Sequence, residues 1–105
     1  MGSPNVLDLL NVALALIKDQ ALNNCLKRVE DAQRAYLLAE ADRGREKNKA
    51  IIKAIAQIDI ERIKLNNTYI KVKDDLGPDG VSIMEDIISF LEKDRKRLAE
   101  EKKTL

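Results

Sequence analysis

A line of polar residues crosses an otherwise apolar stretch in the second half of the chain, and it is the strongest candidate for chemistry. Its members recur at helical spacing and are Asp59, Arg62, Asn66, Tyr69 and Lys73. Arg62 takes a position that the apolar periodicity gives to Ile or Leu, and a buried guanidinium is costly unless it is paired. In one interpretation Arg62 pairs with Asp59, or pairs across a symmetric interface whose register it fixes. In the other, the line forms a groove, between subunits, for an anionic ligand such as a nucleotide or metabolite, because a guanidinium fork suits phosphate and carboxylate.

Basic residues gather immediately before this line. The cluster consists of Arg43, Arg45, Lys47, Lys49 and Lys53, and residues 41–73 hold nine basic side chains against four acidic ones. A surface for single-stranded nucleic acid combines such charge with aromatic stacking platforms. Here Glu46 interrupts the cluster and no aromatic residue lies within it. We therefore expect a solvated basic face, with weak nucleic-acid binding as the alternative.

Catalytic constellations are missing from the sequence. The chain has no histidine, which removes the commonest general base and metal ligand. Ser82 and Ser89 therefore lack an activating imidazole. The single cysteine, Cys25, lies on an apolar stripe, where a structural thiol is expected. We predict a non-enzymatic protein without a metal or cofactor.

One segment invites comparison with a calcium-binding EF-hand loop. Positions one, five, six and twelve of such a loop would be Asp75, Asp79, Gly80 and Asp86. Gly77 stands at position three, where a ligand side chain belongs, and position twelve lacks the usual glutamate. A capped turn between two helices explains the same residues, so we expect no calcium site.

Apolar residues recur every three or four positions along the chain, which is the spacing of amphipathic helices. The pattern predicts helices at about residues 4–42, 46–76 and 82–103, separated by turns at Gly44 and at Gly77. The third helix would begin with a capping box at Ser82. The expected fold class is all-α, with a long antiparallel helical hairpin and a shorter third helix in a coiled-coil-like bundle. Two alternatives stay open: a break of the first helix at Asn23–Asn24, and a β-hairpin over residues 58–73.

The segment VLDLLNVALALI, residues 6–17, is apolar on every side of the helix it would form. Burying a large apolar side chain is worth roughly 1.5 to 3 kcal/mol, so exposure of several together is unfavourable. We expect the bundle to be completed by oligomerisation, as a dimer or larger assembly, through this segment. The alternative is that the third helix covers it within one chain. The expected contact residues are Leu7, Leu9, Leu10, Val12, Ala13, Leu14, Leu16 and Ile17.

Length and composition limit the number of domains and the kind of protein that the chain can be. The chain has 105 residues, 35% of them charged, with a net charge of +1, which suits one helical domain with well-solvated faces. The lone cysteine indicates a reducing, cytoplasmic setting. The apolar N-terminal run is shorter than the roughly 20 residues of a membrane span. We predict an interaction, scaffold or regulatory module that binds itself, another protein or a small anion.

Overall fold

The computed structural model describes residues 5–42 and 47–105. The described residues form four α-helices and one short 3-10 helix. The helices are α1 (Val6–Leu16), α2 (Gln20–Ala41), α3 (Lys47–Val72) and α4 (Gly77–Thr104), with η1 (Lys73–Asp75) between the last two. The predicted helix start at Pro4 and the predicted turn at Gly44 lie outside these residues.

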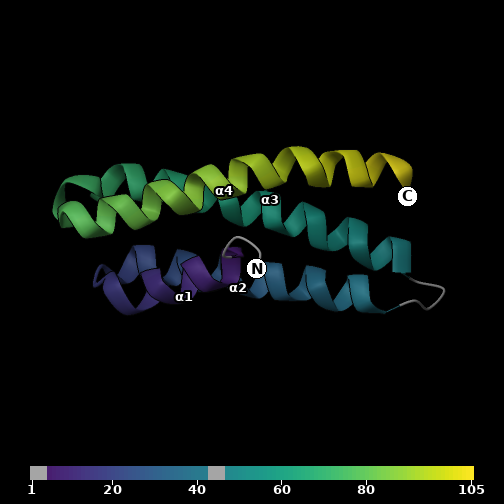
Figure 1. Cartoon of the computed structure of the whole chain (residues 1–105), viewed down its shortest axis with the longest axis horizontal. Helices are drawn as coiled ribbons and strands as arrows, with labels where there is room; N and C mark the ends of the chain where they lie inside the picture. The colour runs from purple at the N-terminus through teal and green to yellow at the C-terminus, as the bar shows by residue number, and fades with distance from the viewer. Residues whose placement is uncertain (1–4, 43–46) are drawn as a thin grey trace.

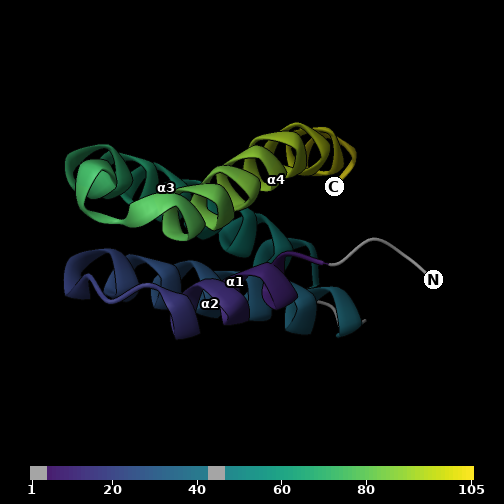
Figure 2. The same ribbon diagram turned by 60° about the vertical axis from the view of Figure 1, so that its left-hand side comes forward.

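The helices form two layers. Figure 1 shows α1 and α2 in one layer and α3 and α4 in the other, with α2 and α3 antiparallel. Each of α1 and α3 packs on both α2 and α4. Because α1 is short, it runs beside only about half the length of α2 (Figure 2). One end of the bundle therefore contains four helices and the other contains three. The expected all-α class and the α2–α3 hairpin are confirmed.

The prediction of one continuous first helix was wrong. Ile17 is extended, with φ −85° and ψ 125°, and α2 starts afresh after Asp19. The Asp19 side chain caps α2 by accepting a hydrogen bond from the backbone N–H of Leu22 at 2.9 Å. The Asn23 amide donates to the carbonyls of Leu14 and Ile17, at 3.3 and 3.1 Å. These bonds satisfy backbone carbonyl groups at the C-terminal end of α1. The break therefore lies at residues 17–19, not at Asn23–Asn24, and lets α1 fold back beside α2.

The later elements also differ in part from their predictions. Residues 58–73 are helical as far as Val72, so the β-hairpin alternative was wrong. Helix α4 begins at Gly77, whose φ of +74° suits glycine, with Pro78 in the first turn. Ser82 is an exposed residue inside α4, so the predicted capping box does not start this helix. Asp86 also lies inside α4, and no EF-hand loop forms over residues 75–86.

Buried apolar side chains form two clusters, one at each end of the bundle. The four-helix end is filled mainly by large side chains: Val6, Leu10, Ala13, Ile17, Leu22, Leu26, Val29, Leu65, Tyr69, Met84, Ile87 and Leu91. The three-helix end contains Ala32, Tyr36, Ala39, Ile51, Ala54, Ile55, Ile58 and Leu98. Within the described ranges, no helix is long and apolar enough to cross a membrane.

Candidate binding surface on helices α3 and α4

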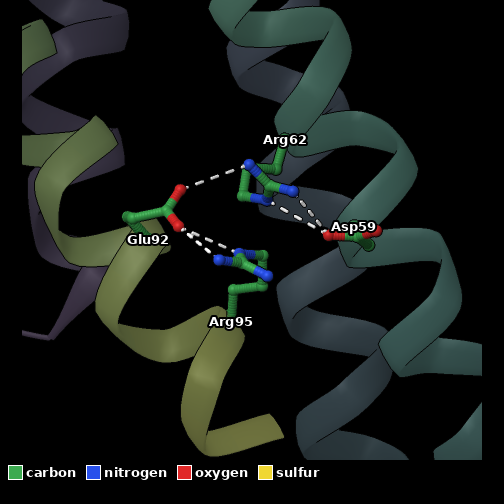
Figure 3. A network of polar contacts seen from close by, with 4 residues as sticks. All are labelled: Asp59, Arg62, Glu92 and Arg95. Carbon is green, nitrogen blue, oxygen red and sulfur yellow. Dashed lines mark hydrogen bonds and ion pairs between the residues drawn. The ribbon is translucent and has the colours of Figure 1, made fainter. Parts of the chain in front are cut away.

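The predicted polar line of α3 faces α4 and forms an ion-pair network with it (Figure 3). Arg62 donates to Asp59 Oδ1 through Nε at 3.2 Å and through Nη2 at 2.7 Å. The Nη1 atom of Arg62 lies 3.5 Å from Glu92 Oε2 on α4. Arg95 in turn donates to Glu92 Oε1, with a shortest distance of 2.7 Å. The pair expected between Asp59 and Arg62 is therefore present within one chain.

The network is balanced in charge, with two guanidinium groups and two carboxylates. The Arg62 side chain is 19% exposed, and this partial burial is compatible with its charge because both sides of the guanidinium are paired. Hydrogen bonds from Arg95 lower the pKa of Glu92, and the nearby charges of Arg62 and Lys96 act in the same direction. Arg62 and Arg95 are thus already committed to carboxylates of their own chain.

The other members of the polar line do not join this network. The ring of Tyr69 is buried, and its hydroxyl donates to Glu85 Oε2 at 2.7 Å. Burial, followed by the bond to Glu85, raises the pKa of Tyr69 to about 12. The Nζ atom of Lys73 lies 5.9 Å from the centre of the Tyr69 ring, a cation–π contact. Asn66 is half-buried.

A groove of about 390 Å³ lies beside the network. Its lining residues belong to α3 and α4, and Figure 1 and Figure 2 both show that α4 diverges from α3 toward the three-helix end. Apolar side chains form most of its wall, including Ile55, Ile58, Leu91 and Leu98. Arg62, Arg95 and Lys102 supply the cations. No carboxylate within the described residues pairs with the Lys102 ammonium, which is exposed.

A row of apolar side chains covers the face of α3 that points away from the core. Ile60 and Ile63 are each 46% exposed and Ile70 is 65% exposed. Ala56, one turn before Ile60, is exposed as well. Helical periodicity places Ile52, Ala56, Ile63 and Ile70 on a second apolar stripe, beside the buried one. Ala56 and Ile60 also line the groove beside α4, whereas none of the described helices covers Ile63 and Ile70.

The N-terminal segment is largely buried within its own chain, and its role in self-association stays a prediction. Three of the expected contact residues, Leu10, Ala13 and Ile17, belong to the buried core. Leu7, Leu9 and Leu14 are half-buried and pack against the same cluster. Only Val12 and Leu16, 51% and 41% exposed, remain available to a partner. The helix that covers the segment is α4, which was the alternative interpretation.

The basic cluster lies mostly outside the described residues. Arg43 and Arg45 are among these, and the side chain of Lys47 is also not described. Lys49 and Lys53 are exposed on the first turns of α3. The prediction for this cluster therefore stays a prediction.

Two residues of the site were not predicted from the sequence, namely Glu92 and Arg95. They lie on α4, some thirty residues from Arg62, and they contact α3 only because the two helices pack together. Their i, i+3 spacing is a weak signal, because such pairs are common on solvated helix faces. Over residues 5–42 and 47–105, no group of three or more potential metal ligands comes together.

No family model, curated protein or solved structure matches this chain. Its function therefore has to be inferred from its own residues and their geometry.

Proposed function

We propose that the protein is a non-enzymatic helical interaction module that self-associates through the outer face of α3. The observation that supports this most directly is the exposure of Ile60, Ile63 and Ile70 on one face of a well-packed helix. Single exposed apolar side chains are ordinary, whereas an aligned row of isoleucines is typical of a contact surface. The rest of α3 is satisfied by its own chain, since Ile51, Ile58 and Leu65 are buried in the core.

The size of this surface favours weak, reversible association. Burying the exposed parts of the three isoleucines would contribute roughly 2 to 5 kcal/mol. Contacts along one helix also fall short of the roughly 800 Å² per partner found in standard interfaces. Association costs several kcal/mol in lost freedom of motion, so we expect a dimer that forms at high local concentration. Such a dimer suits a module that responds to crowding or to a tethering partner.

The outer face of α1 is a weaker candidate for the same role. It offers Val12 and Leu16, but the other large apolar residues of the helix are at least half-buried in its own chain. The α3 face presents more exposed apolar surface along a longer helix.

The test compares two matched pairs of substitutions by sedimentation over a hundredfold range of concentration. Ile63→Glu with Ile70→Glu places two charges on the outer face of α3, and we expect a monomer throughout. Val12→Glu with Leu16→Glu places two charges on the outer face of α1, and we expect the association of the wild type. Circular dichroism checks that each variant is folded. If instead the α1 pair gives a monomer and the α3 pair associates like the wild type, self-association through α3 is wrong and the N-terminal segment is the contact surface.

The groove between α3 and α4 supports a second function, the binding of an amphipathic carboxylate such as a fatty acid. Its volume of about 390 Å³ lies within the range of small-ligand sites. Its largely apolar wall suits an acyl chain better than a nucleotide, and Lys102 on its rim is available to a carboxylate. Arg62 and Arg95 already pair with Glu92, so they would contribute less than Lys102 to binding the carboxylate.

Titration with dodecanoate in a calorimeter tests this second function. Lys102→Ala should weaken binding roughly tenfold, because it removes a charge-assisted hydrogen bond to the ligand. The control is Lys103→Ala, which removes a neighbouring lysine that pairs with Glu100 at 3.3 Å and should leave the affinity unchanged. Equal affinities for the two variants would contradict the assignment of Lys102.

A further inference from the structure

The exposed face of α3 has the spacing of a coiled-coil seam. Its residues alternate at intervals of three and four, and every one of them is exposed: Lys53, Ala56, Ile60, Ile63, Asn67 and Ile70. In heptad terms Lys53, Ile60 and Asn67 take the position called a, while Ala56, Ile63 and Ile70 take the position called d. The face opposite this seam is buried in the bundle core. Helix α3 therefore carries two apolar faces, and only one of them is covered by its own chain.

We propose that a second copy of this chain occupies the seam, with the two α3 helices parallel, in register and related by a two-fold axis. This inference rests on the proposed self-association and adds its orientation and register. In this arrangement Ile60 and Ile63 pack against the same residues of the partner. Asn67 lies opposite the partner's Asn67.

The position of Asn67 is the first argument for a parallel pair. An asparagine at an a position between apolar seam residues, as Asn67 lies between Ile63 and Ile70, lowers stability and fixes the register and the two-stranded state. Its amide can be satisfied in a parallel, in-register pair, where it faces an identical amide that both donates and accepts. In an antiparallel pair that aligns Ile60 with the partner's Ile63, Asn67 faces the partner's Ala56, which has no polar side chain.

Charge on the two edges of the seam is the second argument. Asp59 lies on one edge, and Lys64 lies five residues later on the other edge. In a parallel coiled coil this spacing brings each Asp59 to the partner's Lys64. Asn66 and Lys71 have the same spacing and edges. The antiparallel pair brings edges of one kind together instead, so that Asp59 does not meet the partner's Lys64.

The edge residues are available for these contacts. The Asp59 side chain is 48% exposed although it holds Arg62, and a carboxylate has further acceptor sites. Lys64 and Lys71 are exposed, and no carboxylate within the described part of the chain pairs with either. A parallel pair thus supplies the acidic partner that the Lys64 ammonium lacks in the single chain.

Disulfide trapping distinguishes the two orientations. All variants carry Cys25→Ser, so that the introduced cysteine is the only one. Chains with Lys53→Cys and chains with Ile70→Cys, both of which keep Asn67, are mixed at high concentration and oxidised under mild conditions. A parallel pair gives only disulfides between identical positions, whereas the antiparallel pair gives mixed disulfides that join position 53 to position 70. Mass spectrometry of the digested dimers separates these outcomes, and Lys93→Cys on the exposed face of α4 is the control for random collision.

A charge-reversal series tests the edge contacts in solution. Lys64→Glu should weaken association about three- to tenfold, because it sets two carboxylates against each other on both edges. Adding Asp59→Lys should restore association, since the pair is then reversed but again complementary. Asp59→Asn reports the effect of losing the bond to Arg62 alone. Failure of the double variant to recover would overturn the register.

The outcomes separate this inference from the function on which it rests. A wild-type chain that stays monomeric at every concentration would end both. Association that is sensitive to Ile63→Glu but gives mixed disulfides would keep the self-association and overturn the parallel orientation.

Discussion

The two ends of the bundle contain different kinds of core. At the four-helix end, leucine, isoleucine, valine and methionine fill the space between the helices, and most are completely buried. At the three-helix end, three of the eight buried residues are alanine. Small side chains let helices approach closely but fill little volume. The absence of a fourth helix at one end is thus matched by a smaller core, and α4 diverges from α3 there beside the groove.

A tyrosine ties α4 to the hairpin at each end, but in different settings. At the four-helix end Tyr69 of α3 bonds to Glu85, on a helix that packs directly against α3. At the three-helix end Tyr36 of α2 bonds to Glu101 of α4, although the backbones of these two helices do not come close to each other. Arg97 lies 5.9 Å from the centre of the Tyr36 ring. Long polar side chains thus bridge the space that α1 fills at the other end.

The largest expected difference between the ends is the cost of removing one leucine. Leu26→Ala at the four-helix end removes a completely buried side chain, and we expect a loss of about 3 to 5 kcal/mol in the free energy of unfolding. Leu98→Ala at the three-helix end should cost about 2 kcal/mol, because the adjoining groove lets water and neighbouring side chains reach the space. Urea unfolding measures both values. A larger loss for Leu98→Ala would show that the three-helix end is the better packed.

Alkaline pH tests the hydrogen bonds that Tyr36 and Tyr69 donate to glutamates of α4. Burial, with the bond to a glutamate, raises the pKa of both Tyr36 and Tyr69 from 10.0 to about 12. Each tyrosine therefore stabilises the fold fully below pH 10, and this stability is lost as the pH rises from 10 toward 12. By pH 11 the expected loss is about 1.4 kcal/mol for each tyrosine.

Tyr36→Phe and Tyr69→Phe should each remove one share of this alkaline loss. The measurement is the free energy of unfolding in urea at pH 8 and pH 11, and the double variant controls for the titration of lysines. If the free energy of unfolding falls equally between pH 8 and pH 11 in the wild type and in both single variants, the two tyrosine–glutamate hydrogen bonds do not stabilise the fold as proposed. A change in only one of the variants would show which end depends on its tyrosine.

The cap at Asp19 tests how α1 reaches the four-helix end. Asp19→Ala removes the side chain that starts α2, and we expect a loss of about 1 kcal/mol. Asn5→Ala removes the matching cap of α1, where Asn5 Oδ1 accepts from Asp8 N at 3.1 Å. Its loss should be about 0.5 kcal/mol, because this cap is exposed whereas the cap at Asp19 is partly buried. Thermal unfolding compares the two variants. If Asn5→Ala lowers the stability as much as Asp19→Ala does, the Asp19 cap does not contribute more than an ordinary exposed cap to the break at residues 17–19.

The same break shows what the sequence could and could not predict. The three- and four-residue periodicity predicted the all-α class and the α2–α3 hairpin, because burial selects for that spacing. It missed the break because Ile17 keeps the phase of the stripe while its backbone is extended. A cap signal at Asp19 was present, but an aspartate in a helix is also a common surface residue.

Of the candidate site, the sequence predicted only the contacts between residues of the same helix. The pair of Asp59 with Arg62 follows from local spacing on α3, and it is present. The partners Glu92 and Arg95, and the groove beside them, depend on how α4 crosses α3, and helical periodicity does not determine a crossing angle. The burial of Leu10 and Ala13 depends in the same way on α1 folding back.

The smallest expected effect belongs to Glu92, which lies between the two ends and joins Arg62 to Arg95. Because its pKa is lowered in the folded state, Glu92 stabilises the fold above its unfolded pKa, and this contribution is lost as the pH falls below about 4.5. Glu92→Gln should therefore reduce the fall in stability between pH 5 and pH 3, measured by urea unfolding. Glu100→Gln, on the same helix with the single partner Lys103, is the matched control. If both variants keep the acid dependence of the wild type, the network does not hold α3 and α4 together at the mouth of the groove, and the divergence of α4 is set by side-chain volume alone.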